Sequence, residues 1–464
     1  MKFPGLKPDD IYLPAEGIDL RRWAVVACDQ YTSQPEYWRR VEAYVGAHPS
    51  TLHIVQPEID LARAGARIPA IHRAMREYLS NGTLVRAVRN GFTLTERTTA
   101  SGARLGLVAA VDLEEYDFTP GSGAMVRATE GTIRERIPPR LRIREGAPLE
   151  CPHVMLLLDD PARTVIEPLH ARLRETAPLC DFELMENGGR LRVWGVEGDA
   201  LAPVSDALSA LWERSDGFLY AVGDGNHSLA TAKARWDALK PALSPEEAQT
   251  HPARYALAEI VNLHSPALAF EPIHRVLFGA DMEDLVSAYR AHLASRGMKL
   301  TAVEPLSSRA SGTKPAEPSS SCACGTKPVD PSSSRACEVE SAEPSSSACG
   351  ITPTDEAEMT FVSGNARASY RVGNPENPLP VAVLQPFLDE YLHSHPAARI
   401  DYVHGAAAVE SLCQTPHTTG VLLPAIDKSA LFPAVRQGGA LPRKTFSMGE
   451  PDEKRYYMEC RKIL

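Results

Sequence analysis

The residues best suited to chemistry lie in a glycine-rich turn at positions 223–228, Gly-Asp-Gly-Asn-His-Ser. An apolar stretch precedes the turn at 218–222, and a helical pattern follows from Leu229, which predicts a strand, a turn and a helix. Glycine adopts backbone torsions that other residues avoid and lets a ligand approach closely. The free amides and the positive dipole end of a helix favour an anion. The turn therefore predicts a phosphate or carboxylate site.

Each side chain of the turn suggests a role. Asp224 could act as a general base or hold a metal ion, and His227 could donate to a phosphoryl oxygen. The remaining candidates for phosphate binding within the turn are Gly223, Gly225, Asn226 and Ser228. The alternative is ordinary turn chemistry, since Gly-Asp-Gly is common in turns and Asn and Ser are common helix caps. A dinucleotide site is disfavoured, because Asp224 between two glycines would repel a pyrophosphate.

A second concentration of charge occupies residues 127–144, which hold six arginines. The guanidinium group matches the geometry of phosphate and carboxylate, so the segment predicts an anion site with Arg127 and Arg134 as candidates. The alternative is a solvated surface on which neighbouring glutamates pair with these arginines. Glu130 is a second candidate for the general base. Lys444, near the C-terminus, is a further candidate cation.

Length and charge limit the classes of protein. The 464 residues exceed one ordinary core, so we expect two domains, 1–210 and 211–464, with the glycine turn in the second. The formal net charge of −10 argues against nucleic acid as a partner. No apolar run is long enough for a membrane span, and the first residues do not resemble a signal peptide. We therefore expect a cytoplasmic protein without a membrane partner, whose nine irregularly spaced cysteines are reduced.

Helices and strands alternate along most of the chain. Helical patterns cover 35–45, 67–80, 166–176 and 202–213, and strand patterns cover 23–28, 106–113, 153–158, 190–194 and 218–222. This alternation favours an α/β or α+β fold with mixed sheets flanked by helices.

The segment 305–356 differs in composition from the rest. Pro-Ser-Ser-Ser recurs every 13 residues within it, and large apolar residues are scarce. Such a sequence buries too little apolar surface to offset the entropy of ordering, which predicts a disordered repeat insert. Strand patterns at 299–304, 358–362 and 368–372 predict that the insert interrupts a β-meander.

These segments resemble a bacterial family known as domain of unknown function 1015. The matching stretches are 26–33, 127–132, 143–148, 223–230, 417–420, 441–449 and 454–461. They span nearly the whole chain apart from the repeat insert.

In another branch of that family, the sequence of the glycine turn is Asp-Gly-His-His-Arg. That version is similar to the signature of the ParB/sulfiredoxin-like fold, which includes kinases for free serine. Asp224 and Gly225 match it, and His227 matches the second histidine, whereas Asn226 replaces the first histidine and Ser228 replaces the arginine. Because that arginine is missing, the resemblance implies that Arg127, Arg134 or Lys444 supplies its charge.

The turn, the arginines and the resemblance lead to one functional hypothesis. The chain is expected to be a small-molecule kinase, a phosphotransferase acting on a small hydroxyl metabolite, with free serine as the best specific candidate. Mg²⁺ and a donor such as ATP, ADP or pyrophosphate would complete the reaction. The alternative is a non-catalytic binding or regulatory module for a phosphorylated metabolite or nucleotide. Either reading requires the turn, the arginine segment and Lys444 to meet in one pocket.

Overall fold

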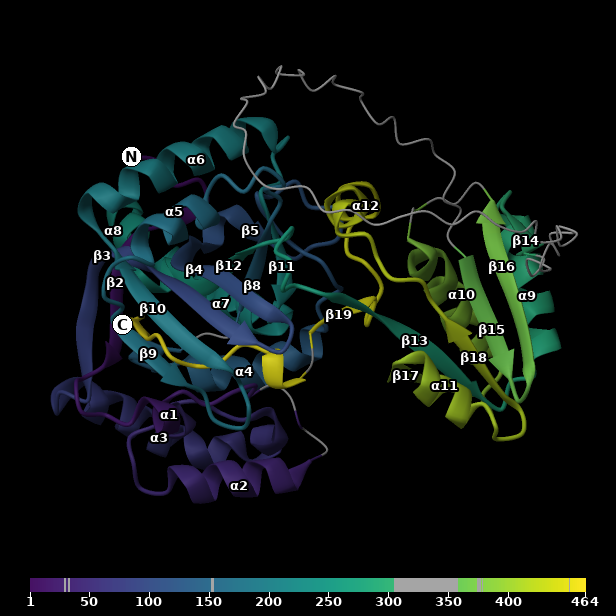
Figure 1. Ribbon diagram of the computed structural model, residues 1–464, viewed down its shortest axis with the longest axis horizontal. Helices are drawn as coiled ribbons and strands as arrows, with labels where there is room; N and C mark the ends of the chain where they lie inside the picture. The colour runs from purple at the N-terminus through teal and green to yellow at the C-terminus, as the bar shows by residue number, and fades with distance from the viewer. Residues whose placement is uncertain are drawn as a thin grey trace, which may run out of the picture.

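The computed structural model describes residues 1–28, 31, 34–151, 154–303, 358–373, 377, 379–449 and 451–464. Within them the chain forms a larger and a smaller lobe, joined by the long strand β13 (Phe270–Phe278) and by the returning C-terminal part of the chain (Figure 1). The predicted disordered insert 305–356 lies outside the described residues. So do four residues of the motif at 26–33.

The larger lobe is built on a mixed sheet, which is 11-stranded in the described part of the chain. Its main path runs β5 (Tyr116–Asp117), β6 (Val126–Ala128), β11 (Tyr220–Asp224), β8 (Met155–Leu158), β12 (Tyr255–Asn262), β4 (Gly102–Asp112), β3 (Leu84–Thr99), β10 (Arg190–Val196) and β9 (Cys180–Glu183). In addition, β1 (Leu6–Lys7) pairs with β4, and β2 (Asp9–Pro14) pairs with β3. The pairs β5–β6, β6–β11 and β8–β12 are parallel and the others are antiparallel, which confirms the predicted mixed sheet.

Helices cover both faces of this sheet. On one face lie α5 (Ile166–Leu173), α6 (Leu201–Arg214), α7 (Asn226–Leu239) and α8 (Pro245–Thr250). The other face carries α1 (Leu20–Trp23), α2 (Pro35–Val45) and α3 (Ala64–Ser80), seen below the sheet in Figure 1. Trp236 lies in the core between the sheet and the first group of helices, and Trp23 lies in the core on the other face. Both side chains are fully buried. The larger lobe therefore has three layers, as the alternating patterns predict.

The smaller lobe is a second sheet with helices packed on it. Its strands follow the order β14 (Lys299–Val303), β16 (Ala366–Gly373), β15 (Glu358–Ser363), β18 (Thr418–Leu422), β13 and β17 (Arg399–His404), and β19 (Phe446–Met448) pairs with the near end of β13. Its helices are α9 (Met282–Ser295), α10 (Pro380–Ser394), α11 (Ala406–Leu412) and α12 (Leu431–Gly438). Its core continues onto Met155 and Leu157 of the larger sheet, so the lobes share apolar packing.

The predicted elements agree with the structure in most places. The helices predicted at 35–45, 67–80, 166–176 and 202–213 are α2, α3, α5 and α6, and the strands predicted at 106–113 and 190–194 are β4 and β10. The domain boundary predicted at residue 210 stays a prediction. The strands β11 and β12, which follow residue 210 in the chain, belong to the sheet of the larger lobe. Among the described helices, none combines the length and apolar character of a membrane span.

Two predicted features are wrong. The apolar run 23–28 is not a sheet strand: α1 ends within it, and beyond the helix a single bridge joins Val26 to Tyr456. The run is apolar because it is buried against the C-terminal segment. The strands around the insert do form, but β16 lies between β14 and β15, so their order is not that of a meander.

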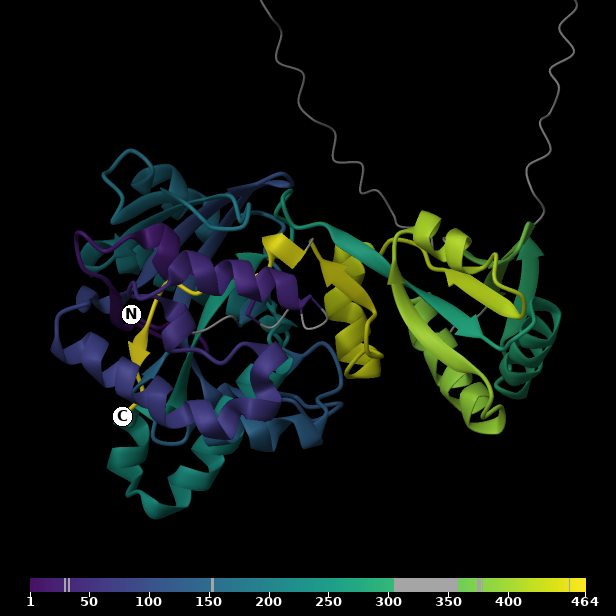
Figure 2. The ribbon, with the colours of Figure 1, turned by 90° about the horizontal axis from the view of Figure 1, so that it is seen from below.

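The C-terminal residues 451–464 return from the smaller lobe and thread into the larger one (Figure 2). Arg97, a fully buried residue of β3, donates to the carbonyl oxygens of Asp452, Glu453 and Lys454 at 2.5–2.8 Å. Beyond them β20 (Arg461–Lys462) pairs with β7 (Leu149–Glu150). This segment therefore becomes part of the wall of the site described below.

Candidate functional site

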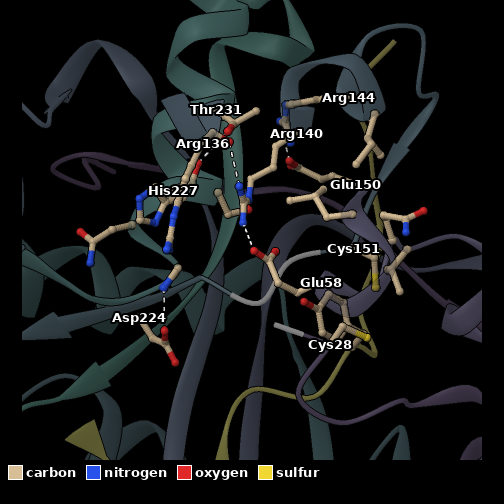
Figure 3. Close-up of a pocket in the computed structure, with 18 of the residues that line it drawn as sticks. Cys28, Glu58, Arg136, Arg140, Arg144, Glu150, Cys151, Asp224, His227 and Thr231 are labelled. Carbon is tan, nitrogen blue, oxygen red and sulfur yellow. Dashed lines mark hydrogen bonds and ion pairs between the residues drawn. The ribbon is translucent and has the colours of Figure 1, made fainter. Parts of the chain in front are cut away.

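A cavity of about 370 Å³ opens in the larger lobe where the turn between β11 and α7 meets α4 (Ile137–Arg144) (Figure 3). The charged side chains and the histidine of its lining are Glu58, Glu130, Arg136, Arg140, Arg144, Glu150, Asp224, His227 and Lys444. The glycine turn, the arginine segment and Lys444 thus line one cavity, as the functional hypothesis requires.

The turn is shaped by packing. The register of β11 against β8 shifts between Val222 and Asp224, which marks a bulge at Gly223. A Cβ atom on Gly223 would lie 2.9 Å from atoms of both Leu157 and Met448. Gly223 therefore serves close packing and does not line the cavity. Gly225 is the N-cap of α7 with φ +82°, and from it Asn226, His227 and Ser228 open the helix against the cavity.

Asp224 and Asn226 bring acceptor oxygens to the cavity. Asp224 Oδ1 accepts from the Gly225 backbone N–H at 2.9 Å, and Oδ2 lies 3.6 Å from the Lys454 ammonium group. Asn226 Oδ1 is buried and accepts no hydrogen bond from the described residues. Lys454 is a cation that the sequence argument missed, because only the returning C-terminal segment brings it to the turn.

His227 is held as a neutral imidazole. The Ile133 backbone N–H donates to His227 Nε2 at 3.3 Å, which leaves the proton on Nδ1. Burial, reinforced by the positive charges of Arg136 and Arg140, lowers the pKa of His227 to about 4. At neutral pH this side chain can therefore donate from Nδ1, but it is not a cation.

The low pKa of His227 has a measurable consequence for stability. Its folded value lies below the ordinary 6.5, so protons bind the unfolded chain more tightly as pH falls from about 6.5 towards 4. Stability should fall over this window, and His227→Gln should remove that part of the fall. Imidazole ¹⁵N NMR should place the titration near 4, and denaturation at pH 7 and 5 should show the loss. A titration near 6.5 would contradict the described environment.

Glu130 lies where three segments meet. Thr129 Oγ1 donates to the Val222 carbonyl at 2.6 Å, and Leu441 N–H donates to the Thr129 carbonyl at 2.7 Å. Burial raises the pKa of Glu130, and the nearby Asp224 charge adds to this, while Lys444 opposes it through its charge and a backbone N–H. The carboxyl is therefore shifted towards the pH at which a general base works best.

The cationic wall comes from one face of α4. Arg136, the N-cap residue of α4, is followed at intervals of four residues by Arg140 and Arg144 within the helix, which places the three on the same side. Arg140 forms an ion pair with Glu58, and Arg144 Nη2 lies 2.6 Å from Glu150 Oε2. Among the described residues, Arg136 has no carboxylate partner. It is thus a cation available to an anionic ligand.

Two arginines predicted from the sequence lie elsewhere. Arg127 Nε donates to the Ala124 carbonyl at 2.8 Å, and its guanidinium group lies 4.5 Å from the centre of the Phe218 ring. Arg134 is exposed in a short 3₁₀ helix, Arg134–Arg136. Neither residue lines the cavity. The four-residue spacing from Arg136 onward is the signal that could have identified the correct arginines.

The smaller lobe holds Lys444 in place. Arg275 of β13 is fully buried, and its guanidinium group donates to the Ile273 carbonyl, to Gln385 Oε1 at 3.1 Å and to the Arg443 carbonyl at 3.3 Å. Lys444 follows directly, with φ +57°, and its side chain lines the cavity. The second lobe thus contributes to the site through a fixed loop.

Several solved structures are similar to this chain at low sequence identity. A conserved hypothetical protein from Pyrococcus furiosus is 9% identical, with 77% of this chain and 95% of that chain covered and a TM-score of 0.33. A mutant free serine kinase in complex with AMP is 10% identical, with 77% and 92% covered and a TM-score of 0.37. SbnI from Staphylococcus aureus, truncated at its C-terminus, is 7% identical, with 74% and 82% covered and a TM-score of 0.35. At these TM-scores the similarity by itself assigns no ligand or activity to this chain.

No curated protein matches the chain. The family described as "Protein of unknown function (DUF1015)" matches residues 12–390, which is most of the chain and includes the glycine turn and α4. The resemblance of the sequence motifs is thereby confirmed: this chain belongs to the family of domain of unknown function 1015.

Proposed function

We propose that the protein is a phosphotransferase that acts on a small hydroxyl metabolite, with free serine as the best specific candidate. The observation that carries the proposal is one cavity in which the Glu130 carboxyl meets Lys444, Arg136 and the start of α7. Phosphoryl transfer depends mostly on positioning and on neutralising charge, and these groups supply both. Free serine is preferred because Asp224, Gly225 and His227 match the version of the turn that resembles kinases for free serine.

In the proposed reaction, Glu130 is the general base. The acceptor hydroxyl donates its proton to the Glu130 carboxylate while its oxygen forms a bond to the transferred phosphorus. The bond between that phosphorus and the bridging oxygen of the donor breaks, and the donor leaves with the electron pair. Glu130 is favoured over Asp224 because burial raises its pKa, whereas Asp224 already accepts from Gly225 and lies 3.6 Å from the Lys454 ammonium group.

The charge on the transferred group would be neutralised from two sides. Arg136 and Lys444 line the cavity without a carboxylate partner among the described residues. The Gly225 N–H already donates to Asp224 and the Ser228 N–H to the Gly225 carbonyl, so the Asn226 amide is the neutral donor left to this proposal at the start of α7, and His227 adds its Nδ1–H. In this scheme Arg136 takes the part that the sequence argument gave to Arg127 and Arg134.

The oxygen atoms beside the turn suit Mg²⁺. Asp224 keeps lone pairs beyond its two contacts, and Asn226 Oδ1 is a buried acceptor without a donor in the described part of the chain. No group of three His, Cys, Asp or Glu forms a cage among the described residues. Mg²⁺ usually binds one or two carboxylates together with phosphate and water, so a site with few protein ligands suits it. When bound, Mg²⁺ would neutralise the charge of the donor phosphates.

A nucleotide fits the cavity better than pyrophosphate as the donor. Besides its charged groups, the lining includes the apolar side chains of Ile54, Val55, Leu61, Met75, Ile143 and Leu149. Such a surface favours a nucleobase, whereas pyrophosphate would leave it uncovered. ATP and ADP both satisfy this condition.

Phosphorus NMR tests the proposal. Purified protein with Mg²⁺ and free serine is given ATP, ADP or pyrophosphate in separate samples. We expect a phosphoserine resonance with ATP or ADP and none with pyrophosphate. The opposite result is a donor that raises the melting temperature but is not consumed with any of a panel of small alcohols and amino acids. That result would overturn the phosphotransferase proposal in favour of a binding module.

A further inference from the structure

Two cysteines face each other where the C-terminal strand β20 pairs with β7, beside the cavity. The antiparallel register places Arg461 opposite Glu150 and Lys462 opposite Leu149. One residue further along the same register, Cys460 stands opposite Cys151. An interaction with the Cys460 thiol contributes to the raised pKa of Cys151, which agrees with this placement.

The backbone geometry at this pair suits a disulfide. The Ile463 N–H donates to the Pro148 carbonyl at 3.1 Å, so the pairs 463/148 and 461/150 occupy hydrogen-bonded positions and 460/151 occupies a non-hydrogen-bonded one. Cys460 instead exchanges its backbone hydrogen bonds with Tyr12 on its other side, at 2.8 and 2.9 Å. In non-hydrogen-bonded pairs the Cα atoms are about 4.5 Å apart, within the range of roughly 4.4–6.8 Å that a disulfide needs.

The two thiols differ in access. Cys151 is partly buried and is one of the residues that line the cavity (Figure 3). Cys460 is fully buried behind it. A small molecule that enters the cavity therefore reaches Cys151 first and Cys460 only through Cys151.

We propose that Cys151 and Cys460 form a redox modification site at which hydrogen peroxide, entering through the cavity, converts the thiol pair into a disulfide. The Cys151 thiolate attacks one peroxide oxygen, the O–O bond breaks, and Cys151 becomes a sulfenic acid with release of water. The Cys460 sulfur then attacks the Cys151 sulfur, the S–S bond forms, the S–O bond breaks, and a second water leaves. The two thiols lose two electrons and two protons, and the peroxide is reduced to two waters.

The disulfide would tie the C-terminal segment to the wall of the cavity. That segment carries Lys454, which contacts Asp224, and Arg461, which contacts Glu150 at 2.6 Å. The new bond would also close a loop of some 300 residues between 151 and 460, and cross-links over long loops restrict the unfolded chain. Oxidation should therefore raise the melting temperature. The proposal is independent of the phosphotransferase assignment.

The rate of oxidation should depend steeply on pH. Burial raises the pKa of the Cys151 thiol well above its ordinary value, and its interaction with Cys460 reinforces this. Because the thiolate is the reactive form, the rate should rise about tenfold per pH unit between pH 7 and 9.

The test uses the full-length reduced chain, treated with hydrogen peroxide at pH 9, alkylated and digested with trypsin. We expect a linked pair of peptides, 145–163 with 456–461, two hydrogens lighter than their sum. The linked pair should vanish in Cys151→Ser and in Cys460→Ala, and it should persist in Cys413→Ser, which removes a buried thiol of the smaller lobe. Dithiothreitol should reverse both the link and the rise in melting temperature.

Two results would overturn the proposal. One is that both peptides carry alkylated cysteine after several equivalents of peroxide. The other is that Cys151 is linked to Cys28 or to a cysteine of the insert in place of Cys460. Because the linked peptides are identified in the wild-type chain, neither result depends on a variant that must fold.

Discussion

Glu130→Gln is expected to lower kcat by a factor of about 10²–10⁴, the usual contribution of a general base. The glutamine keeps the shape of the side chain and can still accept the Lys444 backbone N–H, so the Michaelis constant for the donor should change little. In the wild type, kcat should rise with pH as the Glu130 carboxyl loses its proton, and this rise should be absent in the variant. Steady-state rates between pH 5 and 9 provide the measurement.

The same substitution should stabilise the fold. The folded pKa of Glu130 lies above the ordinary 4.5, so the folded chain holds this proton more tightly than the unfolded chain. Above that ordinary value the ionised carboxylate costs stability, and the cost is absent below it. Glu130→Gln should therefore unfold at a higher temperature than the wild type at pH 7, with the difference shrinking below pH 4.5.

The matched control for this variant is Glu135→Gln, an exposed carboxylate of the same segment, which should alter neither rate nor stability. A Glu130→Gln protein that turns over at the full rate would remove Glu130 from the chemistry. Asp224 would then become the candidate base, and Asp224→Asn the next variant to measure.

Arg455→Met is expected to destabilise the protein by about 3–5 kcal/mol, the usual result of removing one member of a buried ion pair. Arg455 Nε lies 2.9 Å from Glu259 Oε2, and Nη2 lies 2.8 Å from Glu459 Oε2. All three side chains are at most 1% exposed, so methionine would leave two carboxylates buried beside it. The free energy of unfolding from urea denaturation measures the loss.

The loss should depend on pH in a defined direction. In the wild type the pKa of Glu259 is lowered, although burial alone would raise it, because the positive charges of Arg455, Arg104 and Arg97 oppose burial. The stability that Glu259 contributes is therefore present above its ordinary pKa and is lost as pH falls. Without Arg455 that contribution disappears, so the difference between variant and wild type should be smaller at pH 4.5 than at pH 7.

Arg443→Met serves as the control, since this arginine is 57% exposed, lies 3.7 Å from Asp389 and donates to the Tyr402 hydroxyl at 3.0 Å. Exposed pairs contribute about 0–1 kcal/mol, so little change is expected. An Arg455→Met protein as stable as this control would mean that Arg97 and Arg104 neutralise the buried carboxylates without Arg455.

Local patterns in the sequence identified most of the elements and the location of the site. The alternation of helical and strand patterns depends on residues close in the chain, and it predicted α2, α3, α5 and α6 together with β4 and β10. The glycine turn could be found because Gly225 adopts a positive φ at the start of α7, a requirement set within a few residues, whereas Gly223 is needed for close packing on the distant Leu157 and Met448. The strand prediction for the apolar run 23–28 was wrong because a segment buried against a distant part of the chain has the same apolar composition as a buried strand.

Only the tertiary structure decided which charged groups meet at the turn. The packing of α4 against α7 brings Arg136 and Arg140 to the cavity, whereas Arg127 lies against Phe218. Lys454 approaches Asp224 only because the C-terminal segment returns across the larger sheet.

The protonation states of the site residues could not be predicted from the sequence either. The pKa of Glu130 rises and that of His227 falls to about 4 because burial disfavours the charged form of each. Burial is a property of the packed chain, and so are the distances between charges contributed by segments far apart in sequence. The sequence alone therefore identified the residue types of this site. The partners and charge states of these residues were decided only by the packing of the two lobes and of the returning C-terminal segment.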